Sequence, residues 1–513
     1  MRKKKITLYF PRVFSDTRPW HGIPLSLLAI SRTLAKDGYD IHIIADFLFK
    51  DHIKEVVRQC QDSICFGLTC MTGFQIYDAL RIADAVRTSK PDLPIVWGGW
   101  HPSILPEETL ENNLVDIVVQ GQGERKFTEV VRRLHKNASL EGIPGVIHKS
   151  ADGLIKLTPD CVLEDIDNFP PYPYNLVNVE KCLDVTEYGR RTIHYISSYG
   201  CPHRCGFCIE PVVNKRRWTG LSAERVVTDW EYLYKKYHID SIAVYDSNFF
   251  VDKNRVYKIC SGLIKKNIKI KWGNADGRIP QLIKYEPEIW EVMEKSGCKM
   301  ILTGAESGSQ GTLDLIHKDM EVDQIKLFTE LCRKYHIRVF FSYIMGLPWS
   351  KSKKKNEKLF EDDFKQTAQQ IEAMMRIEQG NRFSISVYTP YPGSELYNRA
   401  LQLGLKAPQS LVEWSKFMAV PEDAFEKDVR RRWITRSQAL QITMLTQYIF
   451  GLMDIQTRDR ITSKMHNLII RNLFLFSWNI GLLMARSRWK FKFWSFPVDF
   501  WVYTQIRKYL RLF

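Results

Sequence analysis

Three cysteines lie close together in the segment GCPHRCGFC. Cys201, Cys205 and Cys208 form a C-x3-C-x2-C pattern, and the other cysteines of the eleven are scattered along the 513-residue chain. Thiolates ligate zinc and iron–sulfur clusters, and most such sites take four protein ligands. Three thiolates can hold a cubic cluster and leave one iron open for a substrate or cosubstrate. The alternatives are three unrelated thiols, or a zinc site completed by His203 or His101.

Apolar strands alternate with helical stretches from Tyr195 onward. The six strand candidates are HYISSYG, SIAVYD, IKWGNAD, MILTGAES, RVFFSYIMG and RFSISVYT. Six parallel strands with helices outside describe a partial (β/α)6 barrel, in which chemistry gathers at the C-terminal strand ends. The cysteine loop follows the first strand, and other candidate site residues follow the later ones: Asp246, Asn248, Asp276, Arg278, Glu306, Ser307 and Gly346 to Pro348. The charge run SKSKKKNEK, residues 350–358, predicts a solvated loop.

The first 135 residues show a second alternation of short strands and amphipathic helices. The strands ITLYF, IHIIA, ICFGLTC, IVWGG and VDIVVQG are separated by helical patterns, which favours a doubly wound parallel sheet. Ligands of such sheets bind at the carboxyl ends of the strands. Those ends carry the loops TCMTG, GGWHPS and GQGE, whose glycines allow the backbone to approach a large ligand.

The cysteine motif resembles that of the radical S-adenosylmethionine (SAM) superfamily. This resemblance implies a [4Fe–4S] cluster on Cys201, Cys205 and Cys208, with its unique iron chelated by the amino and carboxylate groups of SAM. One electron into the sulfonium would release methionine and a 5'-deoxyadenosyl radical. Phe207, the aromatic residue next to the third cysteine, is an expected cofactor contact.

Later segments resemble further motifs of the family and follow in the expected order. YDSNFF resembles the second-strand motif that places polar groups near the methionine amino group, although Ser247 stands where relatives commonly have a second acid. NADGRI, TGAESGS and GLPWS follow. The resemblance implies SAM contacts from Asp246, Asn248, Arg278, Gly304, Glu306 and Ser307. Taken singly, each of these residues could equally be a surface charge or a turn residue.

The N-terminal segments WGGWHPS and GQGERKF resemble the cobalamin-binding domain that precedes the radical half in one large subgroup. That subgroup includes cobalamin-dependent methylases and the anaerobic porphyrin-ester cyclase, and the similarity covers about residues 5 to 400. It implies contacts to the corrin ring or its nucleotide tail from Thr69, Gly98, Gly99, His101, Gly121 and Glu124. The alternative is that these glycines close tight turns of an empty sheet.

No histidine is assigned as a lower ligand of cobalt. Cobalamin domains of other enzymes often use D-x-H-x-x-G, and the near match at Asp40 and His42 lies within a predicted strand and has Ala45 in place of the glycine. His21, after the first strand, is a remote alternative. The subgroup allows cobalamin without protein ligation, and that state is the expectation.

The resemblance implies a four-part chain. Residues 1–140 form a Rossmann-like cobalamin domain, 141–190 a linker or subdomain, 191–410 a radical SAM partial barrel and 411–513 a helical region. The expected reaction methylates an unactivated carbon: one SAM methylates cob(I)alamin, a second yields the radical, and the substrate radical takes the methyl group from methylcobalamin. Ring closure, oxidation or rearrangement is the runner-up. An electron donor such as flavodoxin or ferredoxin is expected.

The net charge of +16 is concentrated near the C-terminus. From Asp428 to Phe513 there are 15 Lys/Arg and 4 Asp/Glu. A nucleic-acid-binding iron–sulfur protein is a remote alternative and nucleic acid is not an expected partner, because a local basic segment calls for a local explanation.

Residues 472–485, NLFLFSWNIGLLMA, carry no charge. This run is too short to span a bilayer but suits a buried or interfacial helix.

The C-terminal 28 residues intermix Trp, Phe, Lys and Arg, a composition that favours an acidic membrane surface. The alternative is a small helical domain that packs on the barrel. The start MRKKKITLYF carries no secretory signal and the cysteines show no disulfide framework, so the expected location is the cytoplasm, with peripheral contact to the inner face of the membrane as a second expectation. The substrate is expected to be a small molecule, lipid-like or a hydrophobic tetrapyrrole if the membrane is involved.

Overall fold

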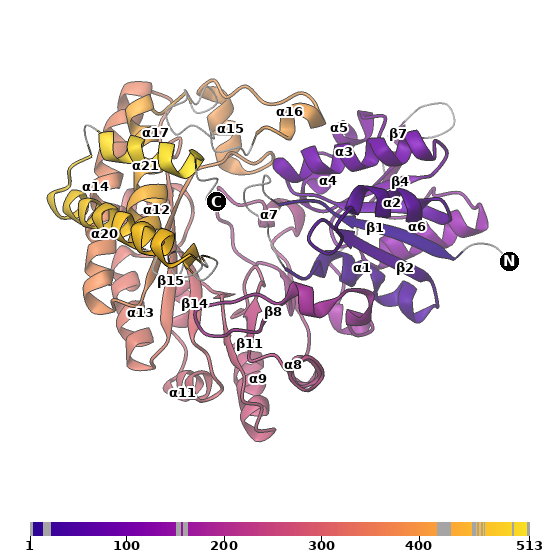
Figure 1. Cartoon of the computed structure of the whole chain (residues 1–513), viewed down its shortest axis with the longest axis horizontal. Helices are drawn as coiled ribbons and strands as arrows, with labels where there is room; N and C mark the ends of the chain where they lie inside the picture. The colour runs from indigo at the N-terminus through magenta and orange to yellow at the C-terminus, as the bar shows by residue number, and fades with distance from the viewer. Residues whose placement is uncertain are drawn as a thin grey trace. The chain divides into compact units, whose positions relative to one another are not determined.

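The structure is a computed structural model of the whole chain (Figure 1). It divides into two compact units. It describes residues 4–13, 22–149, 155–156, 163–417, 432–453, 458, 461–462, 465, 467–494 and 497–509. Unit 1 comprises Met1–Ile301, Tyr391–Ser394 and Ala407–Ala419, and unit 2 comprises Leu302–Pro390, Glu395–Lys406 and Val420–Phe513. Each unit is described by itself. The domain boundaries at 140, 190 and 410 stay predictions.

The N-terminal sheet of unit 1 has the strand order β2-β1-β3-β4-β5-β6-β7. Its first five strands are parallel, as predicted. They are β1 (Lys5–Phe10), β2 (Asp40–Ala45), β3 (Ser63–Thr69), β4 (Ile95–Gly98) and β5 (Ile117–Val119). The order reverses between β1 and β3, and the carboxyl ends on either side of such a switch point are where ligands of these sheets bind.

Helices follow each parallel strand, four of them in stretches predicted to be helical and two, between Gly98 and Ile117, not predicted. They are α1 (Leu25–Lys36), α2 (His52–Cys60), α3 (Phe74–Ser89), α4 (Trp100–Ile104), α5 (Pro106–Glu111) and α6 (Glu124–Lys136). Successive crossovers leave β1 and β2 in opposite directions along the sheet, and right-handed connections therefore place α1 and α2 on opposite faces. Helix α1 contacts α6, and α2 contacts α3, so both faces of the sheet are covered.

Two antiparallel strands extend this sheet beyond residue 140, and the sequence analysis did not predict them. β6 (Val146–Lys149) pairs with β5, and β7 (Ile155–Lys156) pairs with β6. Short 3-10 turns follow at Ile166–Asn168, Tyr174–Leu176 and Val179–Cys182. The four-residue and two-residue strands are too short to show a period-two pattern in sequence.

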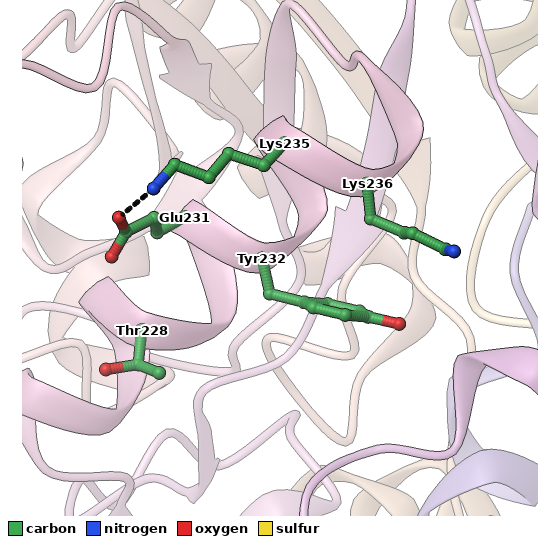
Figure 2. A pocket seen from close by; sticks show the side chains of 5 residues that line it. All are labelled: Thr228, Glu231, Tyr232, Lys235 and Lys236. Atoms are coloured by element: carbon green, nitrogen blue, oxygen red, sulfur yellow. Dashed lines mark hydrogen bonds and ion pairs between the residues drawn. The ribbon is translucent and has the colours of Figure 1, made fainter.

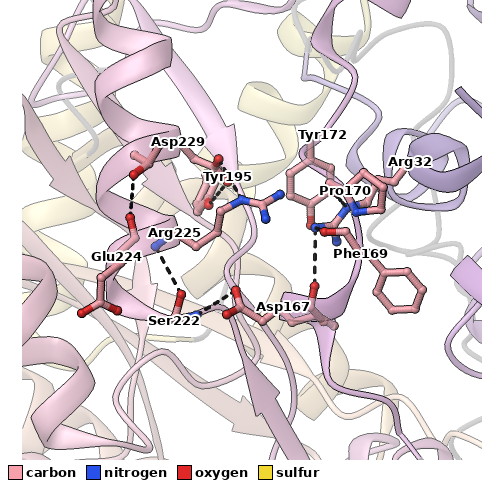
Figure 3. Close-up of polar contacts among 12 residues, drawn as sticks. Arg32, Asp167, Phe169, Pro170, Tyr172, Tyr195, Ser222, Glu224, Arg225 and Asp229 are labelled. Carbon is pink, nitrogen blue, oxygen red and sulfur yellow. Dashed lines mark hydrogen bonds and ion pairs between the residues drawn. The ribbon is translucent and has the colours of Figure 1, made fainter. Parts of the chain in front are cut away.

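The proline-rich segment FPPYPY links α1 to the second half of unit 1 (Figure 3). Arg32 on α1 is buried, donates to the carbonyls of Pro170 and Phe169, and lies 4.6 Å from the ring centre of Tyr172. Just before this segment, Asp167 accepts a hydrogen bond from the Ser222 amide. One buried cation thus organises a stretch of backbone that has almost no regular structure.

The alternation of strands and helices from Tyr195 onward supplies three parallel strands to unit 1. β8 (Thr192–Tyr195) and β12 (Lys271–Gly273) pair with opposite edges of β11 (Ser241–Val244), and β13 (Ala275–Asp276) follows. The predicted strand HYISSYG divides after Tyr195, and its second part, β9 (Ser198–Gly200), forms a hairpin with β10 (Trp218–Gly220). The helices here are α7 (Glu210–Val213), α8 (Ala223–Tyr237), α9 (Lys253–Lys265), α10 (Ile279–Leu282) and α11 (Pro287–Lys295).

Unit 2 contains the last three predicted strands. β14 (Met300–Glu306), of which all but the first two residues belong to unit 2, is followed by β15 (Arg338–Met345) and β16 (Arg382–Val387), which are parallel to each other. The helices are α12 (Gln310–Leu315), α13 (Val322–Lys334), α14 (Lys353–Ile377) and α15 (Glu395–Gln402). All six strand segments predicted for this half are therefore present.

The charge run at residues 350–358 is not a loop, and that prediction was wrong. Ser352 caps α14, its side chain accepting a hydrogen bond from the Lys355 amide. Asn356 is fully buried and its amide nitrogen donates to the carbonyls of Ser350 and Ser352. The lysines project from the first turns of a helix whose far side is buried, and a charge count does not distinguish this from a loop.

The C-terminal region is helical where the structure describes it. α16 (Leu411–Trp414) belongs to unit 1, and α17 (Arg436–Thr443) continues through a π-helical turn (Met444–Ile449) into α18 (Phe450–Met453). α20 (Leu468–Phe491) and α21 (Val498–Tyr509) follow and are yellow in Figure 1. The uncharged run of residues 472–485 lies inside α20, whose 24 residues are long and apolar enough to cross a membrane by length and composition alone.

Candidate cluster and cofactor site

A hairpin closes the cysteine loop. β9 pairs antiparallel with β10, so that Gly200 lies opposite Trp218 and residues 201–217 form the loop. Gly200 has φ +81°, and a Cβ there would lie 2.1 Å from the carbonyl oxygen of Arg217, so glycine is required immediately before the first cysteine. The Cys208 amide donates to the Cys205 carbonyl at 3.1 Å and forms a tight turn between the second and third cysteines. Phe207 lies half-buried in that turn.

The surroundings of Cys201 and Cys208 disfavour a bare thiolate. Burial raises the pKa of Cys201, and raises that of Cys208 to about 12. Two amides oppose this, from His203 toward Cys201 and from Glu210 toward the Cys208 sulfur at 3.4 Å. Thiolates here therefore need a cationic partner, and the irons of a cluster would supply one. None of the ten cysteines in the described part of the chain is disulfide-bonded.

The described residues do not support a zinc site. Among them, no group of three or more His, Cys, Asp and Glu side chains could hold a single metal ion. A cubic cluster places its thiolates on three different irons, so its cysteines are spaced more widely than the ligands of one ion. The zinc alternative completed by His203 or His101 is therefore not found, and the donor set fits a cluster better than a mononuclear metal.

Asp246 fixes the chain just before the cysteine loop. Its carboxylate accepts hydrogen bonds of 2.6 Å from the Ser197 amide and from the hydroxyls of Ser197 and Ser198. Arg255 also donates to the Ser197 hydroxyl, at 2.7 Å. These bonds hold the turn at which the predicted first strand divides into β8 and β9. Contact between Asp246 and SAM stays a prediction, because both of its oxygens are already engaged.

Asn248 and Ser247 also make internal contacts at the end of β11. The Asn248 side-chain oxygen accepts from the Phe250 amide at 3.2 Å, so its contact with SAM likewise stays a prediction. Ser247 donates to the carboxylate of Glu210, which also accepts from Asn214 at 2.6 Å. Glu210 is buried and burial raises its pKa. It was missed in sequence, where one glutamate after a cysteine motif gives no signal.

Arg278 is a buried cation without an anion. The residue is 7% exposed, and neither terminal guanidinium nitrogen has a hydrogen-bond partner among the described residues. Burying a charge in this way is costly unless a ligand pairs with it. A guanidinium fork fits a carboxylate through two parallel hydrogen bonds, as the methionine end of SAM offers. The predicted SAM contact therefore fits the structure at this residue.

The remaining predicted SAM contacts lie in unit 2. Glu306 has φ +61° and pairs with Lys318 at 2.7 Å, both side chains being 7% exposed. A Cβ at Gly304 would lie 1.8 Å from the Glu306 carboxylate, so that glycine makes room for the ion pair. Ser307 donates to Asp363, whose pKa burial raises to about 6. These residues form a rigid corner at the end of β14, and their contact with SAM stays a prediction.

Glycine is required where the predicted cobalamin loops meet. Gly99 has φ +95°, and a Cβ there would lie 2.6 Å from the Thr69 hydroxyl and 2.8 Å from the Cys70 carbonyl. The Cys70 amide donates to the Gly98 carbonyl, and the His101 amide donates to the Cys70 carbonyl. The loops after β3 and β4 are thus joined backbone to backbone at the carboxyl edge of the sheet.

His101 and the GQGE loop carry buried polar atoms without partners. His101 is 1% exposed, its Nδ1 lies 3.2 Å from the Thr72 hydroxyl, and its Nε2 has no partner among the described residues. Burial lowers its pKa to about 3, so the ring is neutral. In the GQGE loop, which begins at Gly121 with φ +61°, Gln122 Nε2 and Glu124 Oε1 are also buried without partners. A ligand rich in amide and phosphate groups, such as cobalamin, fits these atoms.

The loops predicted to bind cobalamin and the cysteine loop meet within unit 1. Helix α4, which begins directly after Gly99, contacts α7, which begins two residues after Cys208. The hydroxyl of Tyr199, which lies two residues before Cys201, is close to the Glu124 carboxylate. The two predicted cofactor sites are therefore neighbours, joined through the segments on both sides of the cysteines.

Two segments from later in the sequence complete this region of unit 1. Trp414 on α16 packs against the His101 ring at 5.6 Å between centres and donates to Glu108 on α5. Tyr391, in the TPYPGSEL loop, lies near Cys208, and burial raises its pKa to about 12. Sequence reasoning missed Trp414 because nothing local marks a tryptophan that packs on a segment 300 residues away.

His42 lies in β2, as predicted, and its ring pairs with Asp40 at 3.1 Å. That no histidine ligates cobalt stays a prediction. His21 lies outside the described residues.

A surface hollow of about 450 Å³ is lined by five residues of a single helix, α8 (Figure 2). Its side chains are Thr228, Glu231, Tyr232, Lys235 and Lys236, and none of them is a predicted site residue.

Two family models match the chain. The B12 binding domain matches residues 11–131, and the Radical SAM superfamily matches residues 195–354. The first covers the sheet with its predicted cobalamin loops, and the second begins at the end of β8 and includes the cysteine loop. The fold class predicted from sequence, a Rossmann-like sheet followed by a radical SAM domain and a helical C-terminal region, is confirmed.

Several relatives have curated names. An uncharacterized methyltransferase of Pyrococcus horikoshii is 26% identical over 82% of this chain and 87% of its own length. The anaerobic magnesium-protoporphyrin IX monomethyl ester cyclase of Rubrivivax gelatinosus is 24% identical over 71% of this chain and 64% of its own length. The hopanoid C-3 methylase of Methylococcus capsulatus is 22% identical over 73% of this chain and 68% of its own length.

Solved structures share the fold. The cobalamin-dependent S-adenosylmethionine radical enzyme OxsB with aqua-cobalamin bound aligns with a TM-score of 0.72 and 18% identity, covering 99% of this chain and 76% of that one. The radical S-adenosylmethionine methyltransferase TsrM from Kitasatospora setae aligns with a TM-score of 0.61 and 17% identity, covering 79% and 78%. At these identities the likeness is one of fold.

Proposed function

We propose that this chain, which belongs to the cobalamin-dependent radical SAM superfamily, is a C-methyltransferase that acts on an unactivated carbon of a small apolar or lipid-like molecule. The observation that supports it most is the contact of α4 with α7, because this contact makes the corrin loops and the cluster loop neighbours within one unit. A methyl donor and a radical generator must both reach one substrate. Of the three relatives named above, one is named as a methyltransferase and another as a methylase, which agrees with this reaction.

The chain's own residues bind and orient the cofactors. The cluster supplies one-electron cleavage of SAM, and cobalamin supplies the methyl group. Cys201, Cys205 and Cys208 hold the cluster, and Arg278 holds the SAM carboxylate with its two unpaired guanidinium nitrogens. His101 stays neutral because burial lowers its pKa to about 3, so it can offer cobalamin an uncharged imidazole nitrogen at any physiological pH.

A second reaction class remains as an alternative. The porphyrin-ester cyclase is 24% identical to this chain over 71% of it, and its printed name describes ring closure, not methyl transfer. The two classes consume SAM differently. A methylase of this kind forms one S-adenosylhomocysteine and one 5'-deoxyadenosine per product, whereas a cyclase forms 5'-deoxyadenosine without S-adenosylhomocysteine.

We place the enzyme in the cytoplasm, with flavodoxin or ferredoxin as the electron donor and with peripheral contact to the inner face of the membrane. None of the ten described cysteines forms a disulfide, which agrees with a reducing compartment. A lipid-like substrate is supported by the exposed apolar surface of α20, because an enzyme whose substrate dissolves in the bilayer has to reach the bilayer surface.

The proposal is tested with holoenzyme, trideuteromethyl-labelled SAM, a chemical reductant and a lipid extract from cells that lack the gene. We expect a product in the apolar fraction that is heavier by about 17 Da, because one hydrogen is replaced by a trideuteromethyl group, with S-adenosylhomocysteine and 5'-deoxyadenosine formed in roughly equal amounts. Formation of 5'-deoxyadenosine with no label in any product would sink the methylase proposal and favour the cyclase class.

A further inference from the structure

Helix α20 presents a continuous apolar face to solvent. Ile469, Leu473, Phe476, Ile480 and Leu483 recur at alternating intervals of four and three residues, which places them on one side of a helix of 3.6 residues per turn. Their side chains are between 45% and 71% exposed. Phe491, 73% exposed, continues the stripe at the end of the helix. Monomeric proteins rarely leave so long an apolar stripe uncovered.

The other side of α20 is attached to unit 2. Trp478, Ala485, Arg488 and Trp489 are its buried residues, and Trp489 packs edge-on against Phe450 with 5.5 Å between ring centres. At about 100° per residue, these positions centre roughly opposite the exposed stripe. The exposed face therefore does not result from a detached helix. It is the outer side of a helix that the protein holds in place.

A buried ion pair secures the C-terminal end of the helix. Arg488 donates to both oxygens of Asp499 on α21, at 2.5 and 2.7 Å, and the two side chains are 9% and 7% exposed. The Tyr448 hydroxyl donates to the same carboxylate at 2.9 Å. This carboxylate joins α20, α21 and the π-helical turn, so the last turns of α20 cannot leave unit 2 without breaking a buried charged network.

The charges that flank the stripe have one sign. Between Asn467 and Trp494 there are five Lys/Arg and no Asp/Glu. Arg471, Arg486 and Lys490 are exposed, and Lys492 pairs with Glu372 of α14 at 3.0 Å. Basic side chains beside an apolar helical face match the surface of a bilayer that contains anionic lipids.

Two other occupants of this face fit less well. The helix is long enough to span a bilayer. Spanning would, however, carry the side of α20 that packs on unit 2, with the Arg488–Asp499 pair, into hydrocarbon. A second copy of the chain would add its own exposed Arg486 and Lys490 to those of the first copy beside the stripe, with no acidic residue on either helix to offset them. The charge pattern favours lipid over both.

We propose that α20 is a membrane-docking element that lies in the plane of an anionic bilayer surface, with its apolar stripe at the boundary between headgroups and acyl chains. The Arg488–Asp499 pair keeps the helix against unit 2 while its outer face is inserted. This inference goes beyond the proposed reaction and stands without it, because it rests on the described surface of α20 alone.

Flotation of the full-length protein with vesicles tests the proposal. We expect binding to vesicles of phosphatidylcholine with phosphatidylglycerol, weaker binding to phosphatidylcholine alone, and release by high salt or by alkaline carbonate. The triple variant Leu473→Gln, Phe476→Gln and Leu483→Gln should reduce partitioning roughly tenfold or more. The matched control, Leu327→Gln with Leu401→Gln, changes exposed leucines of unit 2 that lie off α20 and should bind like the parent chain.

Three outcomes would overturn the proposal. Equal binding of the triple variant and the parent chain would place the docking surface elsewhere. Resistance to alkaline carbonate would show a spanning helix. Light scattering that shows a dimer lost in the triple variant, together with absence of vesicle binding, would assign the face to a second copy. Thermal melting serves as the folding check, since the changed side chains are exposed and their replacement should leave the midpoint within a few degrees.

Discussion

At the scale of single residues, the sequence predicted the kind of chemistry better than it predicted which residues contact a ligand. The cysteine spacing was enough to predict a cluster, because three thiolates within eight residues have few other uses. Arg278, His101 and Glu124 each have at least one buried polar atom without a partner among the described residues, as expected of residues that bind a ligand. Asp246 and Glu306 make strong internal contacts instead. Residue type and order cannot distinguish an acid that holds the chain from one that holds a ligand.

Arg278→Met should weaken SAM binding roughly 10- to 100-fold, since a buried charge-assisted hydrogen-bond pair contributes about 1.5–3 kcal/mol. The same change should leave the iron content intact and raise the melting temperature of the cofactor-free protein, because it removes a buried cation that has no anion. Titration calorimetry of the reconstituted enzyme measures the first effect. Arg190→Met is the control, and unchanged SAM affinity in Arg278→Met would contradict the assignment.

At the scale of elements, alternation predicted the parallel strands that position the site but not β10, which closes the cysteine loop. The errors arose where tertiary contacts override local pattern. The strand HYISSYG divides because Asp246 captures Ser197 and Ser198. The charge run at 350–358 is helical because Ser352 and Asn356 cap and anchor α14. Strands β6 and β7 were missed because they are short and gain their stability from pairing with β5.

Asp246→Asn tests whether the end of β11 positions the cysteine loop. An amide has one acceptor oxygen and cannot replace a carboxylate that accepts three bonds, so we expect a loss of roughly 2–4 kcal/mol in stability and weaker retention of iron. Asp240→Asn, before the start of β11, is the matched control, because Asp240 accepts the amides of Arg190 and Arg191. That variant should lose stability but keep its iron. Equal iron content in the two variants would refute the positioning role.

At the scale of the whole molecule, the family matches cover the two cofactor regions and stop at residue 354. The C-terminal region lies beyond them, and its sequence showed basic and aromatic character without showing which side of α20 is packed. That side depends on Trp489, Arg488 and their partners, which are distant in sequence or on another helix.

The central claim is that one chain holds a [4Fe–4S] cluster and cobalamin in separate but adjoining sites. Metal analysis and optical spectra after anaerobic reconstitution test it most directly. The account predicts roughly four irons and one corrin per chain. Cys201→Ala with Cys205→Ala and Cys208→Ala should lose the iron and keep the corrin, whereas Gly99→Val, whose Cβ would lie 2.8 Å from the Cys70 carbonyl, should lose the corrin and keep the iron. A protein without corrin absorbance, or one whose iron survives the triple cysteine change, would contradict it.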